Sequence, residues 1–95
     1  MADVDPRTLR LPPSRETGAD PGKLQRQIAR FGKTVAGMPR LFVFRMTDNE
    51  LMIYDGVTRA TRVAKLLPGE TVTVEVIGSL AGPGRVQPTV GDRLP

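Results

Sequence analysis

Apolar residues recur at helical spacing over residues 57–67. They are separated by three, four and three positions, which places them on one face of a helix. Thr58, Arg59, Thr61, Arg62 and Lys65 lie on the other side, and Leu67-Pro68-Gly69 is a stop signal. The pattern predicts an amphipathic helix that begins directly after Asp55-Gly56. Its apolar face consists of Val57, Ala60, Ala64 and Leu67.

A second helical pattern covers residues 21–31. Asp20-Pro21 reads as an N-cap followed by proline at the first helical position, and Gly32 ends the pattern. We expect Leu24, Ile28 and Phe31 to face the core. The opposite face carries basic residues spaced three and four apart, which we interpret as a solvated face, with a binding surface as the alternative. These residues are Lys23, Arg26 and Arg30.

Four segments have strand patterns. Leu41 to Arg45 is apolar on both faces, so we expect it inside the sheet, and the turn 46–49 leads to a partner strand over 50–54. Thr71 to Ile77 alternates, with Val72, Val74 and Val76 on the buried face. The segment from Thr8 to Leu11 also alternates and is predicted to be the first strand. Residues 1–5 are polar, and we expect them to be frayed.

The predicted order of elements is β-α-β-β-α-β. This order predicts an α+β domain with a small mixed β-sheet and two helices. Residues 1–77 form the domain, and residues 78–95 form an irregular C-terminal tail that lies along the body or stays mobile. We interpret Met1-Ala2 as an intracellular start, with a longer natural chain, of which this is a fragment, as the alternative.

The composition excludes several kinds of chemistry. The 95 residues include no cysteine and no histidine, so disulfides, thiolate or imidazole metal sites and histidine-based catalysis are excluded. Any catalysis must use carboxylates, Arg, Lys, Tyr, hydroxyls or a hard metal ion such as Mg²⁺. No apolar run approaches the roughly 18 residues of a membrane span, so we expect no membrane partner.

The net charge of +4 favours polyanionic partners such as a nucleic acid, a nucleotide or an acidic protein. Between Gly22 and Leu66 there are nine basic residues and three acidic ones, so positive charge is concentrated in this segment. The alternative is a basic domain whose charge serves only solubility.

The segment from Leu51 to Lys65 joins a strand, a two-residue turn and a helix without a spacer. This arrangement places free backbone N–H groups, the positive end of the helix dipole and the Arg59 guanidinium in one small volume. Such a volume suits a phosphate or another oxyanion. The alternative for Arg59 is a surface arginine that pairs with Asp55.

The order of elements and the Asp55-Gly56-Val57-Thr58-Arg59 junction resemble the ParB N-terminal/sulfiredoxin-like superfamily over residues 4–77. Members have a short strand, a loop with an arginine, a helix that ends at glycine, and a hairpin that leads into a G-x-x-R helix. In this chain the loop is 12–17, with Arg15, and the hairpin is 41–54. The family binds nucleotide phosphates at the G-x-x-R turn or acts on a phosphodiester.

The resemblance implies roles for particular residues. Gly56 would let the backbone approach a phosphate, Thr58 would donate a hydroxyl, and Arg59 would contact phosphate oxygens. Arg62 would add charge, and Arg15 and Lys33 would line the same groove.

The chain also departs from the family. Sulfiredoxins carry a catalytic cysteine in the turn, where Val57 and Thr58 stand here, so reductase chemistry is excluded. Chromosome-partitioning members have G-E-R-R followed by further domains, whereas this chain has G-V-T-R and a tail. The resemblance therefore favours the stand-alone or toxin-borne ParB-like domains, often described as nucleases.

The first functional hypothesis is a metal-dependent nuclease effector that acts on DNA or RNA, with Arg59, Thr58 and Gly56 stabilising charge on the phosphate. Asp55 caps the helix or, alternatively, holds Mg²⁺ or acts as a base, a role that Glu16 shares. By analogy, such an effector acts in the cytoplasm, is delivered at the C-terminus of a secreted toxin and is paired with an immunity protein.

Two alternatives stay open. One is an ATP- or CTP-binding regulatory module, and the other is a protein-interaction domain that kept the fold without catalysis. Tyr54 is interpreted as a half-buried sheet residue, with stacking on a base as the alternative. The three phenylalanines are expected to be buried, which gives little support to the binding of single strands by stacking.

Overall fold

The computed structural model describes residues 1–95 and contains one four-stranded mixed sheet. Its strands are β1 (Ala2–Val4), β2 (Leu41–Arg45), β3 (Leu51–Asp55) and β4 (Val72–Ser79). The strand order is β1-β4-β2-β3, in which β2 and β4 are parallel and the two outer pairs are antiparallel. The predicted α+β class and mixed sheet are confirmed, and β2 is an inner strand as expected.

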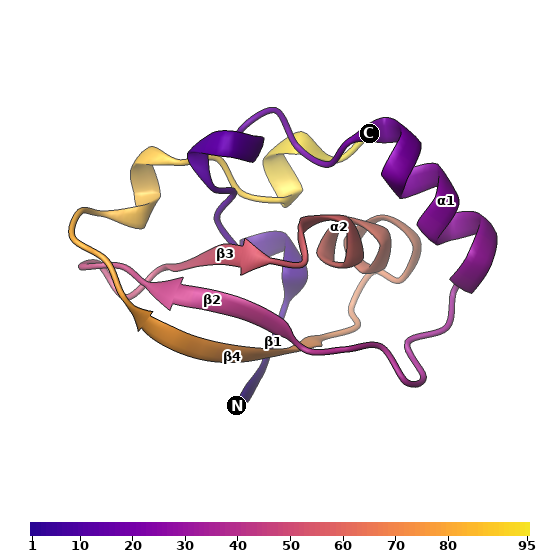
Figure 1. The fold of residues 1–95 in the computed structure, drawn as a ribbon, viewed down its shortest axis with the longest axis horizontal. Helices are drawn as coiled ribbons and strands as arrows, with labels where there is room; N and C mark the ends of the chain where they lie inside the picture. Colours follow the sequence, from indigo (N-terminus) through magenta and orange to yellow (C-terminus); the bar gives the residue numbers. More distant parts are fainter.

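Both predicted helices are present (Figure 1). In α1 (Pro21–Phe31), the Asp20 carboxylate accepts a hydrogen bond of 2.9 Å from the Lys23 N–H, and Gly32 ends the helix with a φ of 56°. The helix α2 (Val57–Leu66) packs its small residues Ala60 and Ala64 against the sheet. Because these side chains are short, the helix axis can approach the strands closely.

The hydrophobic core lies between α2 and one face of the sheet. Leu41 and Val43 of β2 and Val74 of β4 are fully buried, and Ala60 and Val63 of α2 cover them. The alternation predicted for β4 holds for Val72 and Val74, but Val76 is 39% exposed. The register of β4 against β2 shifts directly after Val76, because Ile77 is an extra residue without a partner in β2.

The first strand is not where the sequence pattern predicts it. Residues Ala2–Val4, expected to be frayed, pair with β4, whereas the segment 8–11 makes only isolated bridges at Arg10, to Met52 and to Thr89. The alternation of this segment reflects the burial of Leu9 and Leu11. No longer ladder forms, because Pro12 and Pro13 follow and have no N–H group to donate.

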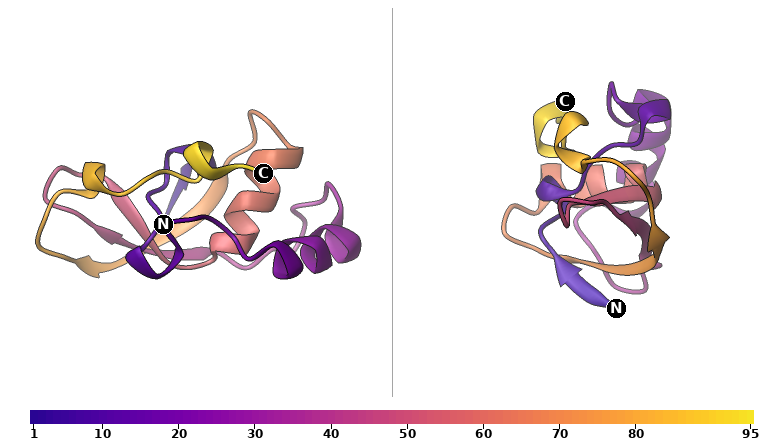
Figure 2. Two further views of the ribbon diagram at one scale, coloured as in Figure 1. Left: turned by 90° about the horizontal axis from the view of Figure 1, so that it is seen from above. Right: turned by 90° about the vertical axis from the view of Figure 1, so that its left-hand side faces the viewer.

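The C-terminal segment packs along the body. Gly78 and Ser79 continue β4, so the strand passes the predicted boundary at residue 77. Beyond it, the Leu11 N–H donates to the Pro88 carbonyl, the Val90 N–H donates to the Leu9 carbonyl, and the Val90 side chain is buried. Figure 2 shows this segment running back across the molecule toward α2. Neither α1 nor α2 has the length and apolar character that a bilayer-spanning helix needs.

Candidate anion-binding groove

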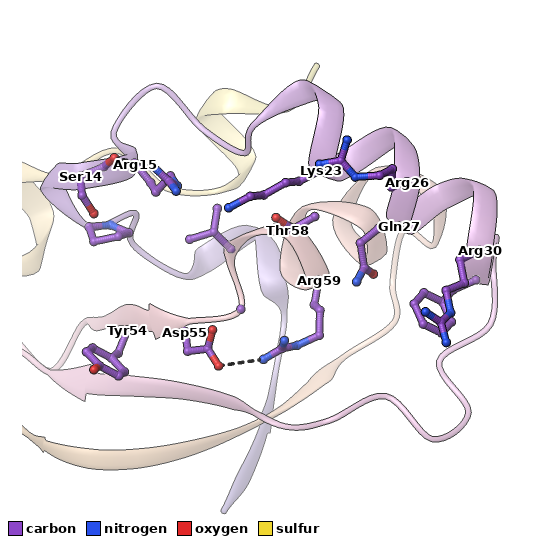
Figure 3. A pocket seen from close by; sticks show the side chains of 14 residues that line it. Ser14, Arg15, Lys23, Arg26, Gln27, Arg30, Tyr54, Asp55, Thr58 and Arg59 are labelled. Carbon is purple, nitrogen blue, oxygen red and sulfur yellow. Dashed lines mark hydrogen bonds and ion pairs between the residues drawn. The ribbon is translucent and has the colours of Figure 1, made fainter.

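A groove with a volume of about 620 Å³ lies between α1 and the β3–α2 junction (Figure 3). Three parts of the chain supply its walls: the loop around Ser14 and Arg15, the polar face of α1, and residues 54–59. The structure therefore brings the loop that carries Arg15 to the Asp55–Arg59 turn. The family resemblance also implied that the Arg15 loop lies close to this turn.

Cationic side chains dominate the lining of the groove. Five of the lining residues are basic and only Asp55 is acidic, so the groove has a strongly positive potential. Figure 3 shows the basic side chains on both sides of the opening. The α1 face that we interpreted as solvated is thus one wall of the groove. The basic residues are Arg15, Lys23, Arg26, Arg30 and Arg59.

The start of α1 fixes the orientation of its basic face. Leu24 is the buried anchor of this helix, with 4% exposure, so Lys23, Arg26 and Arg30 project from the other side. The N–H of Lys23 donates to the Asp20 carboxylate, which lowers the pKa of that carboxyl below its ordinary value. Asp20 is therefore charged at neutral pH and caps the helix.

The β3–α2 junction depends on Gly56. This residue has a φ of 118°, and a Cβ added there would lie 2.5 Å from Cγ of the buried Leu41. The glycine is thus required by packing against β2, in addition to any approach of a ligand. Thr58, two residues further along the chain, lines the groove, and its role as a hydroxyl donor to phosphate stays a prediction.

Asp55 does not cap α2. The N-cap residue is Gly56, which makes no side-chain capping bond, and the Asp55 carboxylate instead lies 3.4 Å from Nη2 of Arg59. The capping interpretation is wrong because the left-handed φ of Gly56 separates Asp55 from the first helical N–H groups. These N–H groups, at the positive end of the helix dipole, are left free of a side-chain cap beside the groove.

Arg59 lies at the floor of the groove with its side chain 20% exposed. Its Nη2 also lies 3.5 Å from the Arg40 carbonyl oxygen, while its Nε is buried and has no hydrogen-bond partner. The weak contacts leave this guanidinium with donor capacity for an incoming oxyanion.

The prediction that Arg62 binds phosphate is wrong. Its side chain is 1% exposed, and Nη1 donates to the carbonyl oxygens of Gly32 (2.9 Å) and Thr34 (2.7 Å). Its Nε donates to Gln27, and the guanidinium lies over the Phe31 ring. Arg62 therefore ties the C-terminal end of α1 to α2. Burial lowers the pKa of its guanidinium, which nonetheless stays charged.

Lys33 and Glu16 are not among the residues that line the groove. Lys33 is exposed in the connector that follows α1, and Glu16 is exposed beyond the Arg15 loop. The prediction that Lys33 contributes to the groove is therefore wrong, because the chain turns away at Gly32.

The aromatic residues differ from the expectation. Tyr54 is 65% exposed at one end of the groove, and Phe31, 38% exposed, lies at another part of its lining. Phe42 and Phe44 are half-buried on the sheet face opposite to the core residues Leu41 and Val43. None of the phenylalanines is fully buried.

The residues of the groove do not form a complete Mg²⁺ site of their own. Asp55 is its only carboxylate and already faces Arg59, and no cluster of three or more acidic side chains exists in the chain. Mg²⁺ in proteins prefers oxygen ligands in octahedral geometry, usually one or two carboxylates together with waters and substrate phosphates. The arrangement instead suits direct contact between guanidinium groups and an oxyanion.

Comparisons of the chain with protein-family models, with curated proteins and with solved structures found no match.

Proposed function

We propose that the groove binds the phosphate groups of a nucleic acid. The observation that carries this proposal is the convergence of five cationic side chains from three parts of the chain on one groove with a single carboxylate. Guanidinium groups bind phosphate oxygens through paired hydrogen bonds, and clustered cations release counterions from a polyanion. The resemblance of the Gly56–Arg59 turn to the ParB-like phosphate-binding turn supports the same proposal.

Fluorescence anisotropy with a labelled oligonucleotide tests the proposal. We expect Arg59→Ala and Arg26→Ala each to weaken binding about tenfold, the equivalent of one charged hydrogen bond of about 1.5 kcal/mol. Arg45→Ala is the matched control, because Arg45 is exposed at the end of β2 and outside the groove. Equal losses in all three variants, or no binding by the wild-type protein, would reject the groove as the site.

Nuclease activity is a further step that the proposal does not require. Cleavage needs a base near the phosphate, and Asp55 is the one carboxylate in the lining of the groove. Incubation with plasmid DNA and total RNA, with and without Mg²⁺, tests this prediction. A nuclease would lose cleavage but keep binding in Asp55→Asn. Action as a cytoplasmic toxin effector with an immunity protein remains a prediction that depends on this result.

A nucleotide-binding module is the second candidate. The groove volume of about 620 Å³ lies within the range of small-molecule sites, which is roughly 300–1,000 Å³. Thermal stabilisation of the protein by ATP or CTP, stronger than that by an oligonucleotide of equal phosphate concentration, would favour this candidate.

A further inference from the structure

We propose that the nucleic acid is single-stranded and that one of its unpaired bases stacks on Tyr54. This inference rests on the proposed function and specifies its substrate class. Tyr54 is 65% exposed and lines the groove next to Asp55, at the end of the groove that also holds Ser14 and Arg15 (Figure 3). A base that stacks there would have its own phosphate within the groove.

The Tyr54 ring is held in position by the sheet. It is carried by β3, and its centroid lies 5.5 Å from that of Phe44 on β2, with an angle of 79° between the rings. An edge-to-face contact fixes the ring and leaves area free for another aromatic group. Phe42, further along β2, is already covered by the Arg40 guanidinium, which pairs with Glu75. Phe31, the other aromatic residue in the lining, is 38% exposed, and the guanidinium groups of Arg30 and Arg62 lie 5.3 and 5.4 Å from its ring centroid. Tyr54 is thus the more open of the two aromatic residues in the groove.

An unpaired base fits this surface better than a duplex does. Bases in a duplex are stacked on each other and offer no free π-face, whereas single strands are bound by cationic grooves combined with exposed aromatic rings. The polar loop around Ser14 and the basic face of α1 stand above Tyr54 and Asp55 in Figure 3. This loop and this helix face would line one side of a bound single strand.

The extent of the charge favours a strand over a single nucleotide. Lys23 and Arg30 are seven residues apart on α1, which corresponds to about 10 Å along the helix axis. Arg15 lies beside the Tyr54 end of the groove, and Arg30 lies at the far end. Cations spread along the groove in this way match successive phosphates of one backbone.

The intrinsic fluorescence of the protein gives a direct test. Tyr54 is the only tyrosine, and the chain has no tryptophan, so tyrosine emission reports on this residue alone. We expect an oligothymidylate to quench the emission on binding, after correction for absorption with free tyrosine. An abasic oligonucleotide, with the same phosphates and no bases, should bind more weakly and cause no quenching.

The possible outcomes separate the two proposals. Binding of both strands with equal affinity and no quenching would overturn the stacking inference and leave phosphate binding intact. If ATP quenches the emission at a lower concentration than the oligonucleotide does, the ligand is a nucleotide and not a single strand. Failure of both strands to bind would overturn the inference together with the proposed function.

Variants supply a second measurement by anisotropy. Tyr54→Ala should weaken binding of the oligothymidylate by about 5- to 150-fold, the range of a base–aromatic stack, and leave abasic binding unchanged. Tyr54→Phe should retain affinity, because stacking does not need the hydroxyl. Val86→Ala, at another exposed apolar residue outside the groove, is the control. A loss in Tyr54→Ala of equal size for both strands would contradict stacking.

Discussion

Arg59 and Arg62 lie three positions apart on α2, and their guanidinium groups have different surroundings. Arg62 is buried and donates to main-chain oxygens of the segment that follows α1, whereas Arg59 lines the groove and makes only two long contacts, of 3.4 and 3.5 Å, through Nη2. Both residues had the same predicted role, because a helical pattern assigns charged positions to the solvent. The carbonyl groups at the end of α1 provide the partners that make Arg62 an exception.

Arg62→Ala should lower the free energy of unfolding by about 2–4 kcal/mol, because it leaves buried carbonyl groups without donors and opens a cavity. Urea denaturation of the two variants Arg62→Ala and Arg59→Ala measures the difference. Arg59→Ala removes a weak ion pair and should change stability by less than about 1 kcal/mol. Equal losses in both variants would show that Arg62 has no special structural role.

Gly56→Ala should destabilise the protein by about 2 kcal/mol or more. The new Cβ would both adopt an unfavourable φ and clash with Leu41, 2.5 Å away. Gly69→Ala is a matched control, because Gly69 also has a positive φ, of 92°, but faces open space. Thermal denaturation should show a larger loss for Gly56→Ala. Similar losses would mean that the backbone conformation alone accounts for both effects.

At the scale of elements, the β2–β3 hairpin anchors the C-terminal segment. Asp48, in the hairpin turn, accepts hydrogen bonds from the main-chain N–H groups of Gly84 (3.0 Å) and Arg85 (3.0 Å). The Gly84 N–H is the main reason that the pKa of Asp48 lies below its ordinary value of 3.8. The Asp48 carboxylate is thus one of the contacts that hold the C-terminal segment on the body, together with the main-chain bonds of Leu11 and Val90.

This shift predicts a dependence of stability on pH. Because the folded-state pKa is lowered, the Asp48 contribution is fully present above about pH 4 and is lost as the pH falls through the folded-state value. Asp48→Asn should therefore be less stable at neutral pH and lose less stability on acidification. Denaturation midpoints from pH 7 to pH 2 measure this, with the exposed Glu70→Gln as control. An unchanged slope below pH 4 would contradict the assignment.

The elements that the sequence predicted well have local signals. Asp20-Pro21 and Gly32 mark the ends of α1, and the alternation of Val72 and Val74 marks β4. The strand Ala2–Val4 has no such signal, because its pairing with β4 comes from main-chain bonds and its residues are mostly exposed. Local patterns cannot report which distant segment offers a partner.

Some residues of the candidate site also have a local signal in the sequence, and others do not. The turn at Gly56 and Arg59 could be predicted from a local motif, and the family resemblance suggested the position of Arg15. The basic residues of α1 could be recognised as a stripe, but only the packing of α1 against α2 places them beside that turn. The exposure of Tyr54 likewise depends on what the rest of the chain leaves uncovered.

At the scale of the whole molecule, the excess of positive charge is concentrated at one site. Five of the basic side chains gather at one groove, and the adjacent end of α2 adds its dipole. Binding of a polyanion there should release counterions and depend steeply on salt. The slope of this salt dependence gives the number of phosphates that the protein contacts, whatever the base sequence of the nucleic acid.

The most direct measurement is the affinity for a single-stranded oligonucleotide over a series of NaCl concentrations. The logarithm of the association constant should fall with the logarithm of salt by about 0.7 for each phosphate contacted. Removing two groove cations in Arg26→Ala/Arg30→Ala should flatten the slope by about 1.4, whereas Arg45→Ala should leave it unchanged. A slope near zero, or the same slope in the double variant as in the wild-type protein, would contradict phosphate binding in this groove.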